Sequence, residues 1–218
     1  LEPEPYCYLE TIAETVAFFN ERLFDRKGVA RLAALTGLTA ADAEAAMRRH
    51  IGVCYDVCHA AVEFEDPQAS IAQLRANGIL IAKIQLSSAL KVAALDAESA
   101  RHLAAFAEPV YLHQAVQKSN GALRRFLDLP QALDASGGAA AGAELRVHFH
   151  VPVFLEQMAH FGTTQTFLAE ILALHRADPI SRHLEVETYT WDVLPPALRG
   201  EPITDSIARE LRWVMERL

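Results

Sequence analysis

The stretch Ile51-Gly-Val-Cys-Tyr-Asp56, the segment Pro67 to Ala76 and the stretch Ile79-Leu-Ile-Ala-Lys-Ile-Gln-Leu86 together decide the fold. The two outer segments are short and mostly apolar, which is typical of strands buried on both faces. The middle segment has helical spacing, begins at a proline and is followed by Asn77-Gly78, which favours a helix end. Strand, helix and strand with short connections predict a βαβ unit and a parallel sheet.

The rest of the chain is interpreted outward from this unit as a single α/β domain over residues 1–218, without internal repeats. Before the unit, we expect helices at Thr11 to Arg26, Val29 to Leu35 and Thr39 to His50. After it, we expect a helix at Ala97 to Phe106, strands at Val110 to His113 and Leu145 to Phe154, a small-residue loop from Asp134 to Gly142, a helix at Thr163 to His175, a strand at His183 to Thr188 and an amphipathic helix at Thr204 to Leu218.

Composition narrows the class of protein. Of the 218 residues, 51% are hydrophobic and 22% are charged, which favours an ordered globular chain. The net charge of −8 gives no general attraction for nucleic acids or anionic membranes, and no apolar run reaches the roughly 18 residues of a membrane span. Cys7, Cys54 and Cys58 form no disulfide framework, so we expect a reducing cytoplasm. Cys54 and Cys58 lack a second pair, which favours buried thiols over a zinc site.

Polar side chains recur at the ends of the expected strands. They are Glu2 and Glu4, Asp56 followed by His59, Lys83 and Gln85, His148 and His150, and Glu185 and Glu187. Each one alone is readily explained as a solvated surface group, but their recurrence favours a common site. In (β/α)₈ barrels, the active site is assembled at the C-terminal ends of several strands. Oxygen and imidazole donors at such a place suit Mg²⁺, Mn²⁺, Co²⁺ or Zn²⁺.

The order of these residues resembles a known metal-site pattern. Glu2, Asp56-x-x-His59, a polar residue near the end of Ile79 to Leu86, and Glu187 follow the order of xylose-isomerase-like sugar isomerases and epimerases, which is Glu, Asp with a following His, His, and Glu. The chain is more narrowly similar to the EboE family of metabolite traffic proteins, in the stretches Leu1 to Thr11, Gly52 to Asp66, Ile84 to Leu90, Val147 to Phe154 and Leu184 to Asp192.

This resemblance implies the C-terminal part of a xylose-isomerase-like (β/α)₈ TIM barrel, with the first half of the barrel preceding Leu1. Residues 87–180 are too long for an ordinary βα connection, so we expect an insertion there before the last strand, in which the strands at 110–113 and 145–154 form a hairpin or ledge over the barrel mouth. A divalent metal ion (Mn, Mg, Co or Zn) is the implied cofactor and a small-molecule metabolite the implied partner. The implied metal ligands are Glu2, Asp56, His150 and Glu187, the catalytic carboxylates are Glu2 and Glu187, and the substrate-binding residues are Glu4, His59, Gln85 and His148.

One position departs from the pattern. Gln85 stands where the sugar epimerases have a metal-binding histidine, and an amide is a poor ligand for transition metals. His148 or His150 is therefore the alternative third ligand. Two functions remain open: a divalent-metal-dependent isomerase or epimerase acting on a sugar or sugar phosphate in metabolite traffic, and a non-catalytic traffic protein that binds a metabolite in the barrel mouth. A phosphodiesterase is less favoured, because the acidic chain gives no sign of a basic groove.

Overall fold

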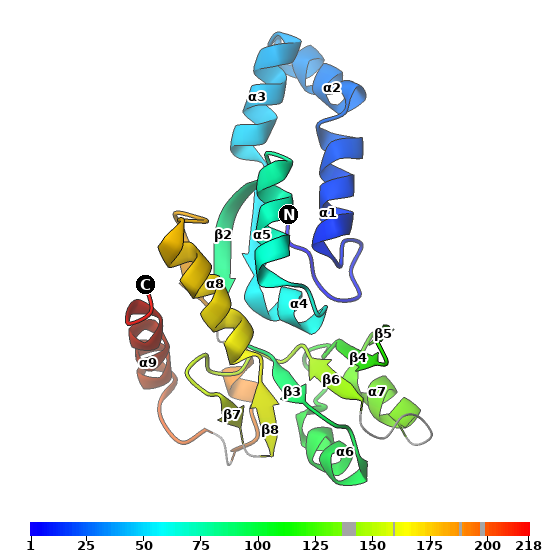
Figure 1. Cartoon of the computed structure of the whole chain (residues 1–218), viewed down its shortest axis with the longest axis vertical. Coiled ribbons are helices and arrows are strands. Elements are labelled where there is room, and N and C mark those ends of the chain that lie inside the picture. Colours follow the sequence, from blue (N-terminus) through cyan, green and yellow to red (C-terminus); the bar gives the residue numbers. More distant parts are fainter. Residues whose placement is uncertain (137–142, 159, 188, 197–198) are drawn as a thin grey trace.

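The computed structural model describes residues 1–136, 143–158, 160–187, 189–196 and 199–218 as a mixed α/β fold (Figure 1). These residues form a three-stranded parallel sheet and a six-stranded antiparallel sheet. Each sheet has its own hydrophobic core. The chain enters the antiparallel part after the second parallel strand and returns to the third, so the two sheets meet at one end of the parallel strands.

The parallel sheet confirms the predicted βαβ unit. Its strands are β1 (Gly52–Asp56), β2 (Leu80–Leu86) and β9 (Leu184–Val186), in the order β1-β2-β9. Asp56 pairs with Gln85, and Leu86 pairs with Val186, so the three strands end close together. Leu1 runs beside β1, because its amino group donates to the Gly52 carbonyl at 2.8 Å and its carbonyl accepts from Cys54 N at 2.8 Å. The described strands do not close into a barrel, so the TIM barrel stays a prediction.

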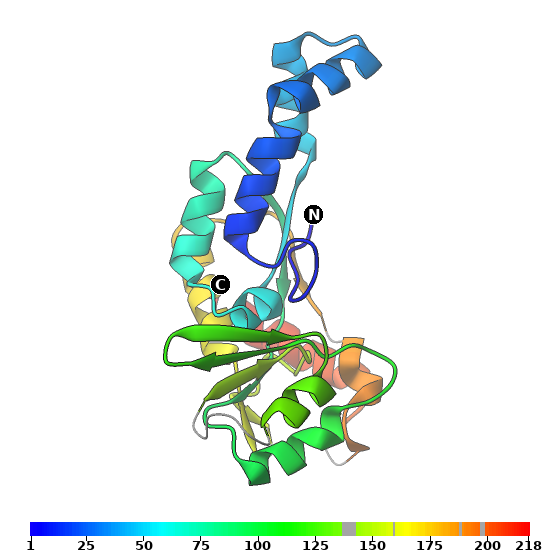
Figure 2. The same ribbon diagram turned by 90° about the vertical axis from the view of Figure 1, so that its right-hand side faces the viewer.

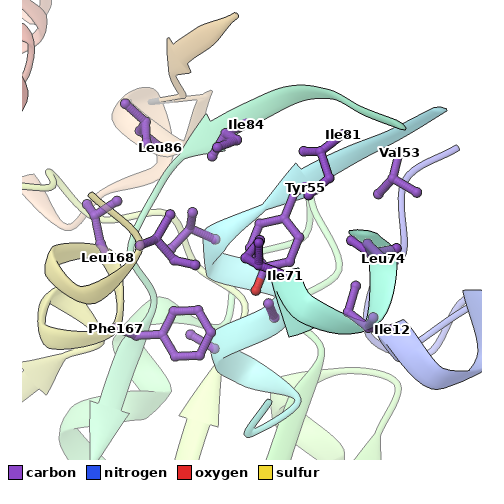
Figure 3. Close-up of a cluster of buried hydrophobic side chains, with 14 of the residues drawn as sticks. Ile12, Val53, Tyr55, Ile71, Leu74, Ile81, Ile84, Leu86, Phe167 and Leu168 are labelled. Atoms are coloured by element: carbon purple, nitrogen blue, oxygen red, sulfur yellow. The ribbon is translucent and has the colours of Figure 1, made fainter. Parts of the chain in front are cut away.

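Helices cover this sheet because their apolar positions match its buried faces. Around it lie α4 (Val57–Val62), α5 (Pro67–Ala76) and α8 (Gln165–Ala177). Tyr55, Leu74 and Leu168 are fully buried in the shared core, which Figure 3 shows. The Asp66 carboxylate caps α5 by accepting from Ala69 N at 2.7 Å, and Gly78, between α5 and β2, has a positive φ of 62°. The predicted bounds of α5 are confirmed by the structure.

A helical segment precedes the sheet. It contains α1 (Ile12–Phe18), the π-helical turn η1 (Phe19–Leu23), α2 (Arg26–Thr36) and α3 (Ala40–His50). Ile12 and Phe19 lie in the core of the parallel sheet, whereas α2 and α3 extend away from the rest of the molecule (Figure 2). The predicted continuous helix from Thr11 to Arg26 is wrong in its last part, because Asp25 caps a new helix there by accepting from Gly28 N at 2.7 Å. The Thr39 cap of α3 follows the prediction.

The antiparallel sheet has the strand order β5-β4-β6-β3-β8-β7. Its elements in chain order are β3 (Leu90–Val92), α6 (Ala97–Leu103), η2 (Ala104–Phe106), β4 (Ala115–Ser119), β5 (Ala122–Phe126), α7 (Leu129–Ser136), β6 (Glu144–Val147), β7 (Gln157–Met158) and β8 (Phe161–Thr163). Leu90, Leu145 and Phe149 lie in its core. We call residues 87–164 the antiparallel segment.

Of the two strands predicted in this segment, one is wrong and the other is too long. Val110 to His113 is not a strand, because the Glu108 carboxylate accepts from the backbone N of Val110 at 2.6 Å and of Tyr111 at 2.9 Å and turns the chain there. The strand from Leu145 ends at Val147 rather than Phe154, since Phe149 N turns back to the Val147 carbonyl at 2.8 Å.

The expected insertion of 87–180 contains two different parts. The antiparallel sheet ends at Thr163, whereas α8 packs its buried Phe167, Leu168 and Ile171 into the core of the parallel sheet. Helix α8 is therefore the connection that brings the chain back to β9. The expected loop at 134–142 begins inside α7, and its residues 137–142 lie outside the described part of the chain. Thr188, the last residue of the expected final strand, is also outside it. The chain ends with η3 (Tyr189–Val193) and α9 (Ile203–Met215).

Candidate metal centre

The candidate centre lies where the parallel strands end and the antiparallel segment begins. Asp56 is the last residue of β1, Gln85 is the last but one of β2, and Glu187 follows β9 directly. The predicted clustering of strand-end side chains at one end of the sheet is thus confirmed for these three residues. From the antiparallel segment, His148 and His150 follow β6 and reach the same place.

Asp56 is the most buried carboxylate of this group, with 2% of its surface exposed. One oxygen accepts from His59 N at 2.9 Å and from the Ser87 hydroxyl at 2.9 Å. The other accepts from the Gln85 amide at 3.0 Å. Burial by itself raises the pKa of Asp56, but the neighbouring His59 and His150 and the His59 backbone N–H together hold that pKa below its ordinary value. Asp56 is therefore an ionised, well-held carboxylate.

Gln85 links two carboxylates. Its amide nitrogen donates both to Asp56 and to Glu187, while its amide oxygen accepts from the Cys54 thiol at 2.7 Å. Burial raises the pKa of Cys54 to about 12, which keeps it protonated as a donor. The amide group of Gln85 thus occupies the space in which a cation shared by Asp56 and Glu187 would sit. This explains in physical terms why the expected Glu-Asp-His-Glu order does not give a four-ligand group here.

Glu187 differs from Asp56 in charge. Burial, followed by the nearby negative charge of Asp56, raises the pKa of Glu187 to about 7. Its side chain is 32% exposed and its carboxylate lies 3.7 Å from His150 Nδ1. A carboxyl group with a pKa near 7 exchanges protons readily at neutral pH. Glu187 is therefore suited to carry a proton at the edge of the centre.

Three buried histidines converge beside Asp56. His59 Nε2 lies 3.1 Å from His148 Nε2, and His148 Nε2 lies 3.2 Å from His150 Nε2. Asp56 approaches the cluster from one side, with one oxygen 4.0 Å from His59 Nε2 and the other 4.0 Å from His150 Nε2. His59 comes from α4, immediately after β1, so the parallel sheet and the antiparallel segment both contribute imidazoles.

The opposite nitrogen of each ring faces an oxygen atom. His59 Nδ1 lies 3.0 Å from the Pro3 carbonyl, and His148 Nδ1 lies 2.7 Å from the side-chain oxygen of Gln114. His150 Nδ1 lies 3.3 Å from the Glu187 carbonyl. Burial holds the pKa of His148 well below its ordinary value and lowers the pKa of His150 to about 4. Both rings are accordingly neutral at physiological pH.

Within the described residues, three groups have ligand atoms close enough to hold a metal ion. They are Asp56 with His59 and His150, Glu4 with His59 and His148, and Cys58 with His148 and His150, and the ligand atoms of each group lie within 4.8 Å of one another. All three groups overlap at the histidine cluster. Imidazole nitrogen, carboxylate oxygen and thiol sulfur are the donors that divalent transition metals prefer, so the residues present fit such an ion.

The predicted site residues divide into two sets. Asp56, Glu4, His59, His148 and His150 come together in these groups. Glu2 lies at their margin, with its carboxylate 3.9 Å from His59 Nδ1 and its side chain 38% exposed, and Glu187 and Gln85 contact Asp56 without joining a group among the described residues. The structure thus brings His59 and His148, predicted to bind substrate, into the position predicted for metal ligands. The catalytic and binding roles themselves stay predictions.

Sequence reasoning missed several residues that build this centre. Ser87 donates to Asp56, Gln114 faces His148, and the Pro3 carbonyl holds His59. Ser87 and Gln114 are polar residues next to expected strands, so their positions carried a weak signal. A backbone carbonyl such as that of Pro3 carries none. Cys58 was favoured as a buried thiol, and it is fully buried, but it also lies beside two histidines.

Comparisons with known proteins give no name to this centre. No protein-family model, no curated protein and no solved structure matches the chain. Among the described helices, none has the length and apolar character needed to cross a membrane.

Proposed function

We propose that this chain is part of a divalent-metal-dependent isomerase or epimerase that acts on a sugar or a related small hydroxycarbonyl metabolite. The observation that supports this most strongly is the meeting of Asp56, the histidine cluster and Glu187 at the ends of parallel strands. Such a position is where parallel α/β folds build active sites. A bound divalent cation would supply Lewis-acid polarisation of a substrate carbonyl.

We also propose that the parallel sheet belongs to a xylose-isomerase-like (β/α)₈ barrel. Strands β1, β2 and β9 lie side by side in chain order and run parallel, as neighbouring barrel strands do, and Leu1 hydrogen-bonds to the free edge of β1. The chain returns from β2 to β9 through α8, which packs on the outside of the sheet as a barrel helix would. The resemblance of the sequence to the EboE family supports this proposal, and we propose that the reaction serves metabolite traffic.

The residues of the chain would divide the work as follows. Glu187 takes a proton from the carbon next to the substrate carbonyl and returns it, for which its pKa of about 7 is suited. Glu2, which is exposed at the same margin, is the candidate for the second carboxylate. Asp56 stays ionised and holds His59 through its backbone N–H. Gln85 fixes the position of Glu187 by donating to its carboxylate.

The test is hydrogen exchange with solvent. The full-length protein, loaded with Zn²⁺, Co²⁺ or Mn²⁺, is incubated in D₂O with a set of aldoses, ketoses and their phosphates, and deuterium incorporation next to the carbonyl is followed by NMR. We expect incorporation with one of these sugars and its loss in Glu187→Gln. Glu185→Gln is the matched control, because Glu185 lies two residues earlier, in β9, and pairs with Lys83 at 2.9 Å. Equal incorporation with and without protein would remove the proposal.

One observation favours the second function, non-catalytic metabolite binding. The Gln85 amide bridges Asp56 and Glu187, so the two carboxylates are already satisfied by a neutral group. A binding protein needs such a fixed polar rim but no proton transfer. Saturable binding of a sugar, measured by calorimetry, without deuterium incorporation would support this function over the first.

A further inference from the structure

We infer that the centre binds a divalent transition metal such as Zn²⁺ or Co²⁺ through three imidazole Nε2 atoms and one carboxylate, and that Gln114 positions one of the imidazoles. The imidazoles are those of His59, His148 and His150, and the carboxylate is that of Asp56. The inference rests on the proposed metal-dependent function. It goes further by naming the ligand atoms, the class of metal and the residue that orients a ligand.

The first step is the position of the ring protons. The Pro3 and Glu187 carbonyls, which face His59 and His150, can only accept hydrogen bonds. Gln114 presents its oxygen to His148 because its nitrogen is directed to the Glu4 carboxylate, to which it donates at 3.0 Å. These acceptors place a proton on Nδ1 of each ring, so that the Nε2 atoms of consecutive rings face one another.

The second step is what such an arrangement requires. Two Nε2 atoms that are both hydrogen-bond acceptors cannot bond to each other. Yet the Nε2 atoms of His59 and His148 lie 3.1 Å apart, and those of His148 and His150 lie 3.2 Å apart. Ligand nitrogens arranged tetrahedrally at about 2.0–2.1 Å from one zinc ion are about 3.3 Å apart. A shared cation therefore fits the spacing of the His59–His148 pair and of the His148–His150 pair, and the group of Asp56 with His59 and His150 has its ligand atoms within 4.8 Å of one another. A shared proton serves only one pair, and burial of the rings opposes it.

The third step is the class of metal. Mg²⁺ and Ca²⁺ prefer six or more oxygen donors and bind poorly to imidazole. This centre offers three nitrogen atoms and the Asp56 carboxylate, a donor set that suits Zn²⁺, Co²⁺ and related ions. Glu187 and Glu2 stay outside it, with Glu187 tied to Gln85. The site therefore selects against Mg²⁺, which the sequence left as one of four choices.

The fourth step concerns Gln114. Its side chain joins Glu4 to His148, and its backbone carbonyl accepts from His148 N at 2.7 Å. Gln114 therefore holds both the backbone and the ring of His148. A partner that holds the second nitrogen of a metal-bound histidine fixes the ring orientation, and its loss typically weakens metal binding about 10–100-fold. Gln114 is thus a positioning residue that links the antiparallel segment to the centre.

The first experiment uses the unaltered protein. In the metal-free protein, ¹H–¹⁵N NMR of the imidazoles should show Nδ1–H tautomers for His59, His148 and His150. Titration with Zn²⁺, Co²⁺ and Mg²⁺, one at a time, should give tight binding of the first two and none of the third. The Co²⁺ form should also show visible absorption typical of nitrogen ligation in a four- or five-coordinate site. Nε2–H tautomers in His148 or His150, or binding of Mg²⁺ as tight as that of Zn²⁺, would overturn the inference.

The second experiment uses matched variants. Gln114→Leu should weaken Zn²⁺ binding about 10–100-fold and change the His148 imidazole signals. Gln117→Leu is the control, because Gln117 is also a buried glutamine of the antiparallel segment but lies in β4. His148→Ala should weaken binding more than Gln114→Leu does, whereas His102→Ala should leave it unchanged, since His102 stacks on His160 at 3.7 Å away from the centre. Equal Zn²⁺ affinity in wild type and His148→Ala would contradict the inference.

The two proposals fail in different ways. Tight Zn²⁺ binding by the three histidines without deuterium exchange on any sugar would leave the inference standing and remove the isomerase. Deuterium exchange that depends on Mg²⁺ and survives His148→Ala would keep the isomerase and remove the inference. If Gln114→Leu fails to fold, as judged by circular dichroism, the tautomers and the metal preference of the wild type still decide the ligand set.

Discussion

The parallel sheet and the antiparallel segment contribute opposite kinds of group to the candidate centre. The ends of the parallel strands supply carboxylates, of which Asp56 is ionised and Glu187 has a pKa of about 7. The antiparallel segment supplies His148 and His150, which burial keeps neutral. One region therefore sets the charge of the centre and the other supplies most of its nitrogen donors. The comparison teaches that neither sheet forms the centre alone, so changes in the two regions should have separable effects.

The largest expected effect comes from opening a cavity in either core. Leu74, in α5, and Leu145, in β6, are both fully buried. Leu74→Ala and Leu145→Ala should each lower the free energy of unfolding by about 2–5 kcal/mol. At a temperature where both variants stay folded, Leu145→Ala should also weaken Zn²⁺ binding, because β6 leads directly into His148. Urea unfolding and calorimetric titration measure the two effects.

The control for this pair is Leu211→Ala, since Leu211 is 47% exposed on α9. Its unfolding free energy should stay within about 0.5 kcal/mol of wild type. If Leu74→Ala weakens Zn²⁺ binding as much as Leu145→Ala does, substitutions in the two regions do not have separable effects on the centre.

The difference between the regions also explains how far the sequence could predict the structure. The parallel unit has apolar strands of five and seven residues and a helix bounded by Pro67 and Asn77-Gly78, so periodicity and turn residues located it. In the antiparallel sheet, β3, β7 and β8 have only two or three residues each, too few to show a period. One hairpin did have a signal, because Asn120-Gly121 joins β4 to β5 with positive φ at both residues.

The candidate centre was predictable to a similar extent. Strand-end carboxylates follow from the ends of apolar runs, so Asp56 and Glu187 were located with their strands. The sequence assigned His59 and His148 to substrate binding and Glu2 and Glu187 to the metal, because spacing along the chain does not tell which ring nitrogens meet. That depends on the chain turning back after Val147 and on acceptors such as the Pro3 carbonyl. Such contacts join residues far apart in the sequence.

The next largest effect is expected at Asp56, the most buried carboxylate at the ends of the parallel strands. Asp56→Asn should weaken Zn²⁺ binding by at least about tenfold, because a charged ligand becomes a neutral amide. From the sequence alone, relief of repulsion between carboxylates predicts unchanged or higher stability without metal. The structure changes this expectation, since Asp56 accepts from His59 N, Ser87 and Gln85. An amide cannot accept from all three, so stability should fall by roughly 1–3 kcal/mol.

Asp66→Asn is the matched control for this prediction. Asp66 caps α5 by accepting from Ala69 N, and asparagine is an equally good N-cap residue. Thermal unfolding and Zn²⁺ affinity of Asp66→Asn should therefore match wild type. Unchanged Zn²⁺ affinity in Asp56→Asn would mean that this carboxylate is not a ligand and that the parallel sheet contributes only His59.

A smaller effect, dependent on pH, is expected at Glu187. Its pKa is raised from 4.5 to about 7 in the folded protein, so the unfolded chain loses this proton first as the pH rises. The raised pKa does not change the free energy of unfolding below pH 4.5. Between pH 4.5 and 7 it lowers that free energy progressively, and above pH 7 it lowers it by a constant amount. Glu187→Gln removes this cost. In the metal-free protein it should therefore leave stability unchanged at pH 4 and raise it by roughly 1–2 kcal/mol at pH 8, after allowance for solvent screening.

The measurement is thermal unfolding with a chelator present, at several pH values from 4 to 8, for wild type and Glu187→Gln. The sign is what matters, because the lowered pKa of His150 acts in the opposite sense. Because the pKa of His150 is lowered from 6.5 to about 4, this ring makes the free energy of unfolding fall as the pH drops from 6.5 toward 4, in both proteins alike. A difference between the two proteins that shrinks as the pH rises would show that Glu187 does not have a raised pKa.

The smallest effect is expected at Glu185, two residues before Glu187 in the chain. Glu185 lies in β9, its side chain is 60% exposed, and it pairs with Lys83, whose side chain is 36% exposed, at 2.9 Å. Exposed ion pairs typically contribute about 0–1 kcal/mol, because water screens the attraction and two long side chains must be ordered. Glu185→Gln should therefore lower the unfolding free energy by less than about 1 kcal/mol. Its effect should shrink further at high salt and should not grow between pH 5 and 8. Zn²⁺ affinity should be unchanged.

If Glu185→Gln instead reproduced the pH-dependent stabilisation expected of Glu187→Gln, the effect would come from the negative charge of this part of the chain as a whole. Burial beside Asp56 would then not be the cause, and the assignment of Glu187 as the proton carrier would lose its physical basis.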